Sequence, residues 1–518
     1  MTAYRSLRRR SAAFTATLAT VLAATLTGTA APAAAAAAPV AWSPCTETTL
    51  VGYDCATYLV PLDHDKPGGA TTPIALSRRP ANNPATRIGT IFVNPGGPGG
   101  AGRGLVRSSA TIFSTAVLDR FDVVGFDPRG IGASAPLQCF TDDVAAEALF
   151  NKMSLVPLTK QQIVDTLRAN YAYTEACKRD AGPLLTHMST LNVAKDLDLL
   201  RQGVGDRDLT FLGFSYGTLI GATYANLFPQ RVRAIINDGN VDPDQRTNHR
   251  LANKFDRAGG FEKALDGMLK ACDAAGAACA FSGGARAKFD ALRERLRQGP
   301  FDTGDGEQIT IDDLTNYITG QLYVITRFPA TAATLQATYE LVISPGPAAR
   351  RGIAANPLPA APKGRGWLGD AYSYNANDSF FAVNCADAPL PRVPALYPGF
   401  AVVFESAHRT FGRAEAFGEV GCANWPKITE RYNGPWNRRT ANPVLVVNPT
   451  YDPATPYVFA QRMTRELGNA RLLTLDGFGH TTRFSACITG WYTRYLLERE
   501  LPPVGTRCAQ DVAPFPPA

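Results

Sequence analysis

The segment Gly213-Phe214-Ser215-Tyr216-Gly217 constrains the fold of this chain more than any other feature of its sequence. It follows an apolar run at residues 209–212, which predicts a strand, and precedes residues 218–227, which have the composition of a helix. A G-x-S-x-G pentapeptide between a strand and a helix is typical of a sharp turn that exposes the serine hydroxyl. The flanking glycines avoid crowding in that turn and tolerate its dihedral angles. The pattern predicts a nucleophilic Ser215, and the alternative is an ordinary strand-helix turn.

A serine hydroxyl is a weak nucleophile at neutral pH, so it needs a histidine to take its proton and a carboxylate to orient that histidine. Two apolar strands expected near the C-terminus end in such residues. The first covers residues 443–449, and the turn after it contains Asp452-Pro453. The second covers residues 471–475, and the glycine-bearing loop after it contains Gly479-His480. Strand ends of this kind present side chains over the carboxyl edge of a sheet.

We therefore predict Ser215 as the nucleophile, Asp452 as the acid and His480 as the base, in that order along the chain. His408 is the alternative base, because it also comes late in the chain, and Asp476 is the alternative acid. Taken singly, Asp452 is also explained by an Asp-Pro turn and His480 by a structural loop histidine.

A glycine-rich run, Asn94-Pro95-Gly96-Gly97-Pro98-Gly99-Gly100-Ala101-Gly102, follows the strand expected at residues 89–93. It lacks the lysine of a P-loop and the G-x-G-x-x-G spacing of a dinucleotide fold. We interpret it as an oxyanion loop, in which backbone amides stabilise the tetrahedral intermediate. The predicted donors are the amides of Tyr216 and Gly97, with Gly96 as the alternative to Gly97. We expect no cofactor and no metal site, because the five histidines are scattered.

These motifs resemble those of a known family. Residues 94–99 are similar to the His-Gly-Gly-Pro-Gly loop of the prolyl iminopeptidase branch of α/β-hydrolases, with Asn94-Pro95 ahead of the glycines. Asp127-Pro128-Arg129-Gly130-Ile131-Gly132-Ala133-Ser134 is similar to the D-x-R-G-x-G-x-S segment of that branch. Together with the serine, acid and histidine motifs, they most resemble the secreted tripeptidyl aminopeptidases of actinomycetes. The resemblance implies an α/β-hydrolase fold: a mostly parallel sheet flanked by helices, with a large, mainly helical cap.

The resemblance also implies supporting and substrate-binding residues. Thr455 matches a threonine that recurs in the family and would support the loop of Asp452; the alternative is an N-cap of the following helix. The tryptophan-rich cap segment that carries the amine-binding glutamates of prolyl iminopeptidases has no match here. By position, Asp387 is the first candidate for binding a substrate ammonium. Other candidates by position are Glu405, Glu415 and Glu419.

Strands and helices alternate up to about residue 237, which predicts right-handed crossovers and a parallel sheet. The last strands follow only after a gap of about 200 residues, so an inserted cap is expected between them. The Pro/Gly/Ala-rich residues 345–366 are either a surface linker or an edge of this cap. The predicted divisions are an export signal (1–38), the first part of the core (39–243), the cap (244–438) and the C-terminal part of the core (439–518).

The N-terminus predicts export. Four arginines without an acidic residue precede an apolar, alanine-rich run from residue 12 to about residue 26. That run is short for a bilayer span, and Ala-x-Ala options follow it, so we expect a cleaved signal, a secreted protein and no membrane anchor. Removing residues 1–38 would lower the formal charge from +7 to +3. A nearly balanced charge gives no reason to expect a nucleic-acid partner.

Ten cysteines, an even number, predict disulfides in an exported chain. Pairing each cysteine with its neighbour in sequence is the simplest arrangement. The shortest loops are Cys45 with Cys55 and Cys272 with Cys279, and Cys385 with Cys422 would close the end of the cap. The alternative is that one or two cysteines are buried and free.

We thus expect a secreted serine exopeptidase that releases short peptides, tripeptides by the resemblance, from free N-termini. The alternatives are an exported esterase or lipase with the same three residues, and a non-catalytic binding protein on a hydrolase fold.

Overall fold

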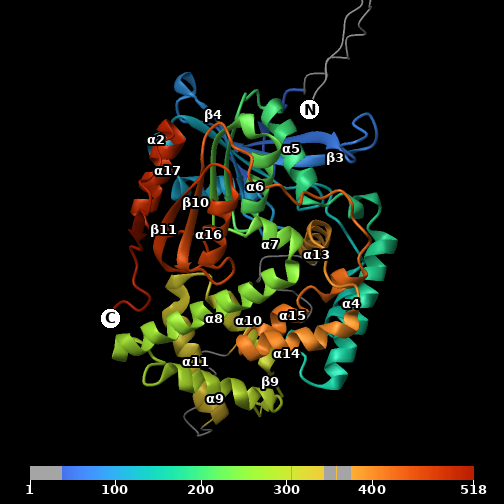
Figure 1. Cartoon of the computed structure of the whole chain (residues 1–518), viewed down its shortest axis with the longest axis vertical. Helices are drawn as coiled ribbons and strands as arrows, with labels where there is room; N and C mark the ends of the chain where they lie inside the picture. Colours follow the sequence, from blue (N-terminus) through green and yellow to red (C-terminus); the bar gives the residue numbers. More distant parts are fainter. Residues whose placement is uncertain (1–37, 305, 344–357, 359–374, 518) are drawn as a thin grey trace, which may run out of the picture. The chain divides into compact units, whose positions relative to one another are not determined.

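The computed structural model describes residues 38–304, 306–343, 358 and 375–517. Its main element is a ten-stranded sheet with the order β1-β2-β3-β5-β4-β6-β7-β10-β11-β12 (Figure 1). β1, β2, β3 and β5 pair antiparallel, whereas all pairs from β5 to β12 are parallel. The strands are β1 (Ser43–Pro44), β2 (Asp54–Pro61), β3 (Thr71–Arg79), β4 (Gly89–Asn94), β5 (Phe121–Phe126), β6 (Leu209–Phe214), β7 (Val232–Asp238), β10 (Val444–Tyr451), β11 (Ala470–Phe478) and β12 (Arg507–Ala509).

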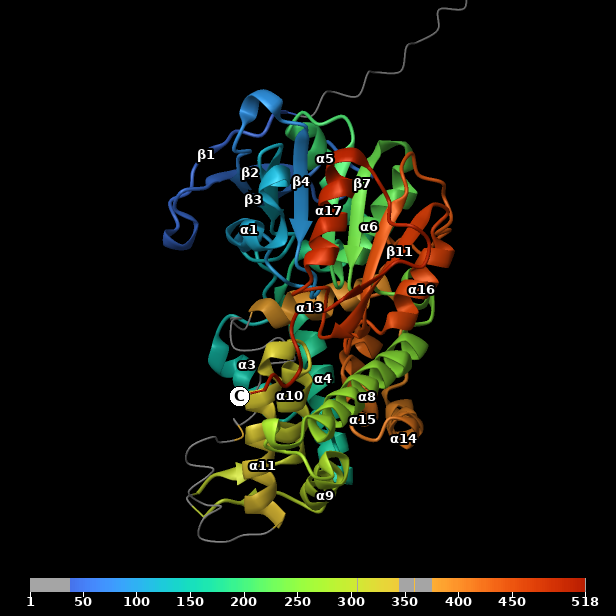
Figure 2. The same cartoon turned by 90° about the vertical axis from the view of Figure 1, so that its left-hand side faces the viewer.

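The central strands are buried along their whole length and mainly apolar, because helices cover both faces of the sheet (Figure 2). Successive residues of β4 show this: Ile91 and Val93 pack in one buried cluster, and Phe92 packs in the other. One face is covered by α1 (Ser109–Ile112), α2 (Thr115–Leu118) and α17 (Ala486–Glu498). The other is covered by α5 (Thr190–Gly203), α6 (Gly217–Leu227) and α16 (Tyr457–Glu466).

The chain leaves the sheet after β7 and returns at β10, and the intervening residues form a mainly helical cap (Figure 1). Most of its helices share a buried apolar cluster separate from the two clusters of the sheet. Its elements are α7 (Pro243–Asn248), α8 (Arg250–Ala275), α9 (Ala285–Arg297), β8 (Phe301–Asp302), β9 (Gln308–Ile309), α10 (Ile311–Gln321), α11 (Phe328–Ile343), α13 (Asn375–Asp387), α14 (Tyr397–Ala407) and α15 (Gly412–Phe417).

Two helices between β5 and β6, α3 (Asp143–Phe150) and α4 (Lys160–Asp180), also reach the cap. The segment before α4 packs Val156 into the apolar cluster of the cap, and its backbone amide donates to Asp312 (2.8 Å). α4 starts at a capping box in which the Thr159 and Gln162 side chains accept each other's backbone N–H groups. The cap surface therefore draws on two separate stretches of the chain.

All ten cysteines lie in five pairs with S–S distances from 1.93 to 2.05 Å, which confirms the neighbour-to-neighbour pairing. Each bridge closes a loop and contributes about 2–4 kcal/mol by constraining the unfolded chain. The pairs are Cys45–Cys55, Cys139–Cys177, Cys272–Cys279, Cys385–Cys422 and Cys487–Cys508.

Two predicted segments lie outside the described residues: nearly all of the export signal at 1–38 and, except for Leu358, residues 345–366. Within the part that is described, no helix combines the length and the apolar character needed to cross a membrane.

Candidate active site

Ser215 lies in the turn between β6 and α6, as predicted, at the carboxyl end of a central strand. Its φ angle is 56°, in the left-handed region that a non-glycine residue rarely adopts. Such a conformation costs on the order of 1–3 kcal/mol and persists only where the surroundings impose it. Here Ser215 N–H donates to the Asp238 carbonyl of the neighbouring strand β7 (2.9 Å). The turn thus holds the serine at the edge of the sheet, where its side chain is half-buried.

His480 and Asp452 are in direct contact. Nδ1 of His480 lies 3.0 Å from both carboxylate oxygens of Asp452. The Asp452 side chain has no exposed surface, and that of His480 is 10% exposed. Because an ionised carboxylate only accepts hydrogen bonds, this contact places the proton on Nδ1 and leaves Nε2 able to accept one.

The loop after β10 holds the Asp452 carboxylate in place. Its oxygens accept hydrogen bonds from the backbone N–H groups of Ala454 (3.0 Å), Thr455 (2.8 Å) and Thr481 (3.2 Å). The Thr455 hydroxyl also lies 3.3 Å from Nδ1 of His480. Helix α16 starts at Tyr457, with Pro456 as its N-cap and no side-chain hydrogen bond at the cap. Thr455 therefore contacts the acid and the histidine and does not cap that helix.

Asp238 joins the serine turn to the histidine loop, and no motif of the sequence indicated this role. Its carboxylate accepts hydrogen bonds from the N–H (3.0 Å) and hydroxyl (2.8 Å) of Thr482 and from the hydroxyl of Tyr492 (2.9 Å). Burial, together with the nearby charge of Asp452, raises the pKa of Asp238 to about 6.

Ser215 and His480 both lie next to the segment Asp238–Gly239, Ser215 through its hydrogen bond to the Asp238 carbonyl and His480 through its position beside Gly239. A Cβ added at Gly239 would lie 3.3 Å from Cε1 of His480. The structure describes both side chains, and it has no hydrogen bond between Ser215 Oγ and Nε2 of His480.

The glycine-rich loop lies directly against the serine turn. A Cβ added at Gly96 would lie 2.9 Å from both Ser215 Cβ and Tyr216 N, so only glycine permits this approach. The Gly96 amide donates to the Asn94 side chain (2.9 Å) and is therefore occupied. For Gly97 and Tyr216, which are both described, no hydrogen bond from the backbone N–H to a protein acceptor is found. These two amides remain free to act as donors to a substrate oxygen.

Asp387 ends α13 and lies behind Tyr216. Its oxygens accept hydrogen bonds from the N–H (2.7 Å) and the hydroxyl (2.6 Å) of Thr190, the first residue of α5. The Thr190 hydroxyl also contacts the hydroxyl of Tyr216. Burial raises the pKa of Asp387, although the hydrogen bonds from Thr190 oppose this shift. Asp387 is thus connected to the residue after Ser215 and is 3% exposed.

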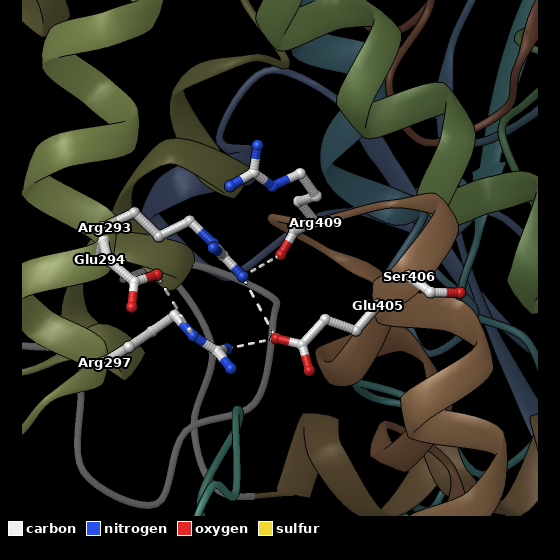
Figure 3. Close-up of a pocket in the computed structure, with 6 residues that line it drawn as sticks. All are labelled: Arg293, Glu294, Arg297, Glu405, Ser406 and Arg409. Atoms are coloured by element: carbon white, nitrogen blue, oxygen red, sulfur yellow. Dashed lines mark hydrogen bonds and ion pairs between the residues drawn. The ribbon is translucent and has the colours of Figure 1, made fainter.

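The other candidate carboxylates are held by cations of the cap. Glu405 pairs with Arg293 and Arg297 beside a cavity of about 330 Å³ between α9 and α14 (Figure 3). It also pairs with Arg413. Residues that line this cavity are Arg293, Glu294, Arg297, Glu405, Ser406 and Arg409.

Glu415 and Glu419 are buried and belong to an ion-pair network with helix α8. Glu415 pairs with Lys254 and Arg257, each at 2.7 Å. Burial by itself would raise the pKa of Glu419, but the charges of Arg250 and Lys254 outweigh it and lower that pKa. Both carboxylates therefore have cationic partners within the cap.

The alternative base and acid lie elsewhere. His408 belongs to the cap, where its ring packs on Phe255 with centroids 4.6 Å apart, and burial lowers its pKa. Asp476 is exposed on β11 and pairs with Arg507. Neither residue contacts the Asp452–His480 pair in the described structure.

Comparisons with known proteins agree with this fold. The alpha/beta hydrolase fold family matches residues 89–273, and the TAP-like protein family matches residues 408–508. The chain is 32% identical over 497 residues to serine protease Hip1 of Mycobacterium tuberculosis, covering 91% of each chain. It is 32% identical over 492 residues to carboxylesterase B of the same species, covering 90% of each. It is 30% identical over 483 residues to tripeptidyl aminopeptidase of Streptomyces lividans, covering 89% of this chain and 84% of the relative.

A mostly parallel sheet with a serine in a strained turn after a central strand, and with an Asp–His pair after later strands, defines a serine hydrolase of the α/β-hydrolase class. Within that class, the chain belongs to the family of tripeptidyl-aminopeptidase-like hydrolases. The predicted family and fold are therefore confirmed.

Proposed function

We propose that this protein is an exported serine exopeptidase that releases tripeptides from the free N-termini of peptides. The observation that carries the proposal is the contact of His480 Nδ1 with Asp452, at 3.0 Å, on the carboxyl edge of the strands that present Ser215. The similarity of this chain to serine protease Hip1 and to tripeptidyl aminopeptidase supports a peptide substrate.

The reaction follows from the positions of these groups. Ser215 Oγ attacks the carbonyl carbon of the scissile peptide bond, and Nε2 of His480 takes the hydroxyl proton. Asp452 stabilises the resulting imidazolium, and the amides of Gly97 and Tyr216 donate to the oxyanion. The C–N bond then breaks as His480 protonates the leaving amine, which gives an acyl-enzyme. Water, deprotonated by His480, hydrolyses the ester and restores the Ser215 hydroxyl.

The cap, proposed to span residues 244–438, would close the cleft. It would thereby set the number of substrate residues between the free N-terminus and the scissile bond. Asp387 is the first candidate to hold the substrate ammonium. Two of the roughly four acceptor positions of its carboxylate are taken by Thr190, so an ammonium would share the carboxylate with this residue. Losing such a buried charge pair costs about 2–5 kcal/mol, or roughly 30-fold to several thousand-fold in rate.

A pair of chromogenic substrates tests the exopeptidase. A tripeptide anilide with a free amine should be cleaved well, and its N-acetylated form should lose most of its kcat/KM. Asp387→Asn should narrow the difference between the two, whereas Asp476→Asn, an exposed control, should not. Equal cleavage of both substrates by the unmutated enzyme would exclude exopeptidase activity. Release of single residues or dipeptides would keep the chemistry and discard the tripeptide length.

An esterase is the second candidate, and the relationship to carboxylesterase B favours it. The same three residues hydrolyse esters, because the acyl-enzyme chemistry does not require an amide. Hydrolysis of short acyl esters with no cleavage of any tripeptide anilide would select this candidate. Failure of a serine-directed organophosphate to label Ser215 would instead indicate a binding protein.

Export is supported by the five cystines, which persist in oxidising compartments. We propose that residues 1–38 are removed on export, without a membrane anchor. Expression of the full chain in an actinomycete, followed by N-terminal sequencing of the culture-medium protein, checks this. Retention of the uncleaved chain in the membrane fraction would contradict it.

A further inference from the structure

A residue of the cap touches His480 directly. Tyr323 follows helix α10, and its main-chain carbonyl accepts the backbone N–H of His480 (2.9 Å). Gly479 makes this contact possible: a Cβ added there would lie 3.0 Å from the Tyr323 carbonyl oxygen, and its φ angle is +100°. The glycine before the histidine is therefore needed where the cap meets the histidine loop.

The side chain of Tyr323 makes a second contact. Its ring stands at 74° to the imidazole of His480, with centroids 5.0 Å apart. This is the edge-to-face geometry that aromatic rings prefer. Asp452 holds Nδ1, but a hydrogen bond at one nitrogen leaves the imidazole free to tilt about that contact. The tyrosine ring restricts this tilt from the cap side.

The Tyr323 ring is itself anchored. Its hydroxyl interacts with the guanidinium of Arg257 on α8. Arg257 pairs with Glu415 of α15 (2.7 Å), whose side chain is completely buried, and Glu415 also pairs with Lys254. A buried ion pair of this kind is costly to break, because either partner would be left as an isolated charge. The Tyr323 ring is therefore held in place by the ion-pair network of Arg257, Glu415 and Lys254 in the cap.

We propose that Tyr323 is a positioning residue for His480, so that packing of the cap against the core completes the alignment of the catalytic base. This inference rests on the proposed function, in which His480 is the base. It predicts that the cap contributes to the rate of Ser215 acylation even for a reagent too small to occupy a peptide site. A displacement of about 1 Å in a catalytic group can cost about 100-fold in rate.

The test compares three variants of the full-length, exported enzyme. Tyr323→Ala should lower kcat for the tripeptide anilide by about 10- to 100-fold with KM nearly unchanged, because the ring acts on the base and not on the substrate. The rate of Ser215 labelling by a small organophosphate should fall by the same factor. Tyr323→Phe keeps the ring but loses the contact of the hydroxyl with Arg257, so its kcat should lie between those of the unmutated enzyme and Tyr323→Ala. Tyr339→Ala, which removes another half-buried cap tyrosine whose ring packs on Phe281, should change neither rate.

Each of the following outcomes tests the positioning role of Tyr323. A labelling rate for Tyr323→Ala equal to that of Tyr339→Ala overturns it, as does a raised KM with unchanged kcat. Tyr323→Leu, which keeps most of the side-chain volume, replaces the alanine variant if that one folds poorly. His480→Ala separates the two proposals. If His480→Ala loses labelling while Tyr323→Ala keeps it, only the positioning role fails. If His480→Ala is labelled at the unmutated rate, the proposed function itself fails.

Discussion

Asp452→Asn replaces one carboxylate oxygen by an NH₂ group with little change in volume. Oδ1 of Asp452 accepts two backbone N–H groups, from Ala454 and Thr455, whereas Oδ2 accepts one, from Thr481. The amide oxygen should therefore take the Oδ1 position, and the NH₂ group should face Thr481 N–H and Nδ1 of His480. Because NH₂ donates, it favours the imidazole with an unprotonated Nδ1 and a proton on Nε2. That tautomer cannot accept a proton from serine.

We expect kcat to fall by about 10⁴-fold, as when the orienting acid of a catalytic triad is made neutral. This ratio corresponds to about 5 kcal/mol in activation free energy. KM should change little, because Asp452 is buried behind His480. The Thr481 N–H would lose its acceptor, which lowers the free energy of unfolding by about 1–3 kcal/mol. The variant should therefore fold and yet be nearly inactive.

The assay is steady-state cleavage of the tripeptide anilide, with urea unfolding of each variant to verify its fold. Asp476→Asn is the matched control, since this late aspartate is exposed and pairs only with Arg507 in the described structure. Retention of more than about a tenth of kcat by a folded Asp452→Asn would refute the assignment of the acid. A large loss in the control would move that assignment to Asp476.

Three further predictions concern the base, a buried carboxylate and the cystines. His480→Ala should lower kcat by about 10⁴- to 10⁶-fold, and His408→Ala should not. Steady-state kinetics of both variants check this, and the opposite result would identify His408 as the base. The folded pKa of Asp238 lies above its unfolded value of about 4, so its contribution to stability is complete below pH 4 and is lost as the pH rises through about 6. Urea unfolding from pH 4 to pH 7 should show the unmutated protein losing about 3 kcal/mol relative to Asp238→Asn, and parallel curves would contradict the raised pKa. Thiol titration of the denatured, unreduced protein should find no free cysteine, and eight or more reactive thiols would exclude the five cystines.

Local sequence predicted the central fold well, because the relevant signals are local. The pentapeptide around Ser215 marks a strand, a tight turn and a helix within a few residues, and the structure has β6, the turn and α6 there. The apolar runs before Asp452 and His480 likewise became β10 and β11. The cysteine pairs that close short loops were predicted for the same reason, since cysteines close in sequence remain close in space.

Local sequence patterns did not predict the roles of the residues that connect the separate parts of the site. No sequence motif indicated Asp238, yet it binds Thr482 beside the histidine. Asp387 is held by Thr190 behind Tyr216, although its sequence neighbourhood marked it as a candidate for substrate. Both contacts join segments far apart in the chain, and no local pattern encodes them.

The sequence by itself determined the class of chemistry, because a strained serine turn, strand-end aspartate and histidine, and a glycine run each require particular residue types at particular spacings. Tertiary structure decided which carboxylates are free and what touches the base. Glu405, Glu415 and Glu419 have the charge to bind an ammonium, but their partners come from helices α8, α9 and α15. Tyr323 has no motif and contacts His480 only because the cap packs on the core. Charge and hydrogen bonding in a protein depend on which groups share a low-dielectric interior, and that is a property of the fold and not of any short segment.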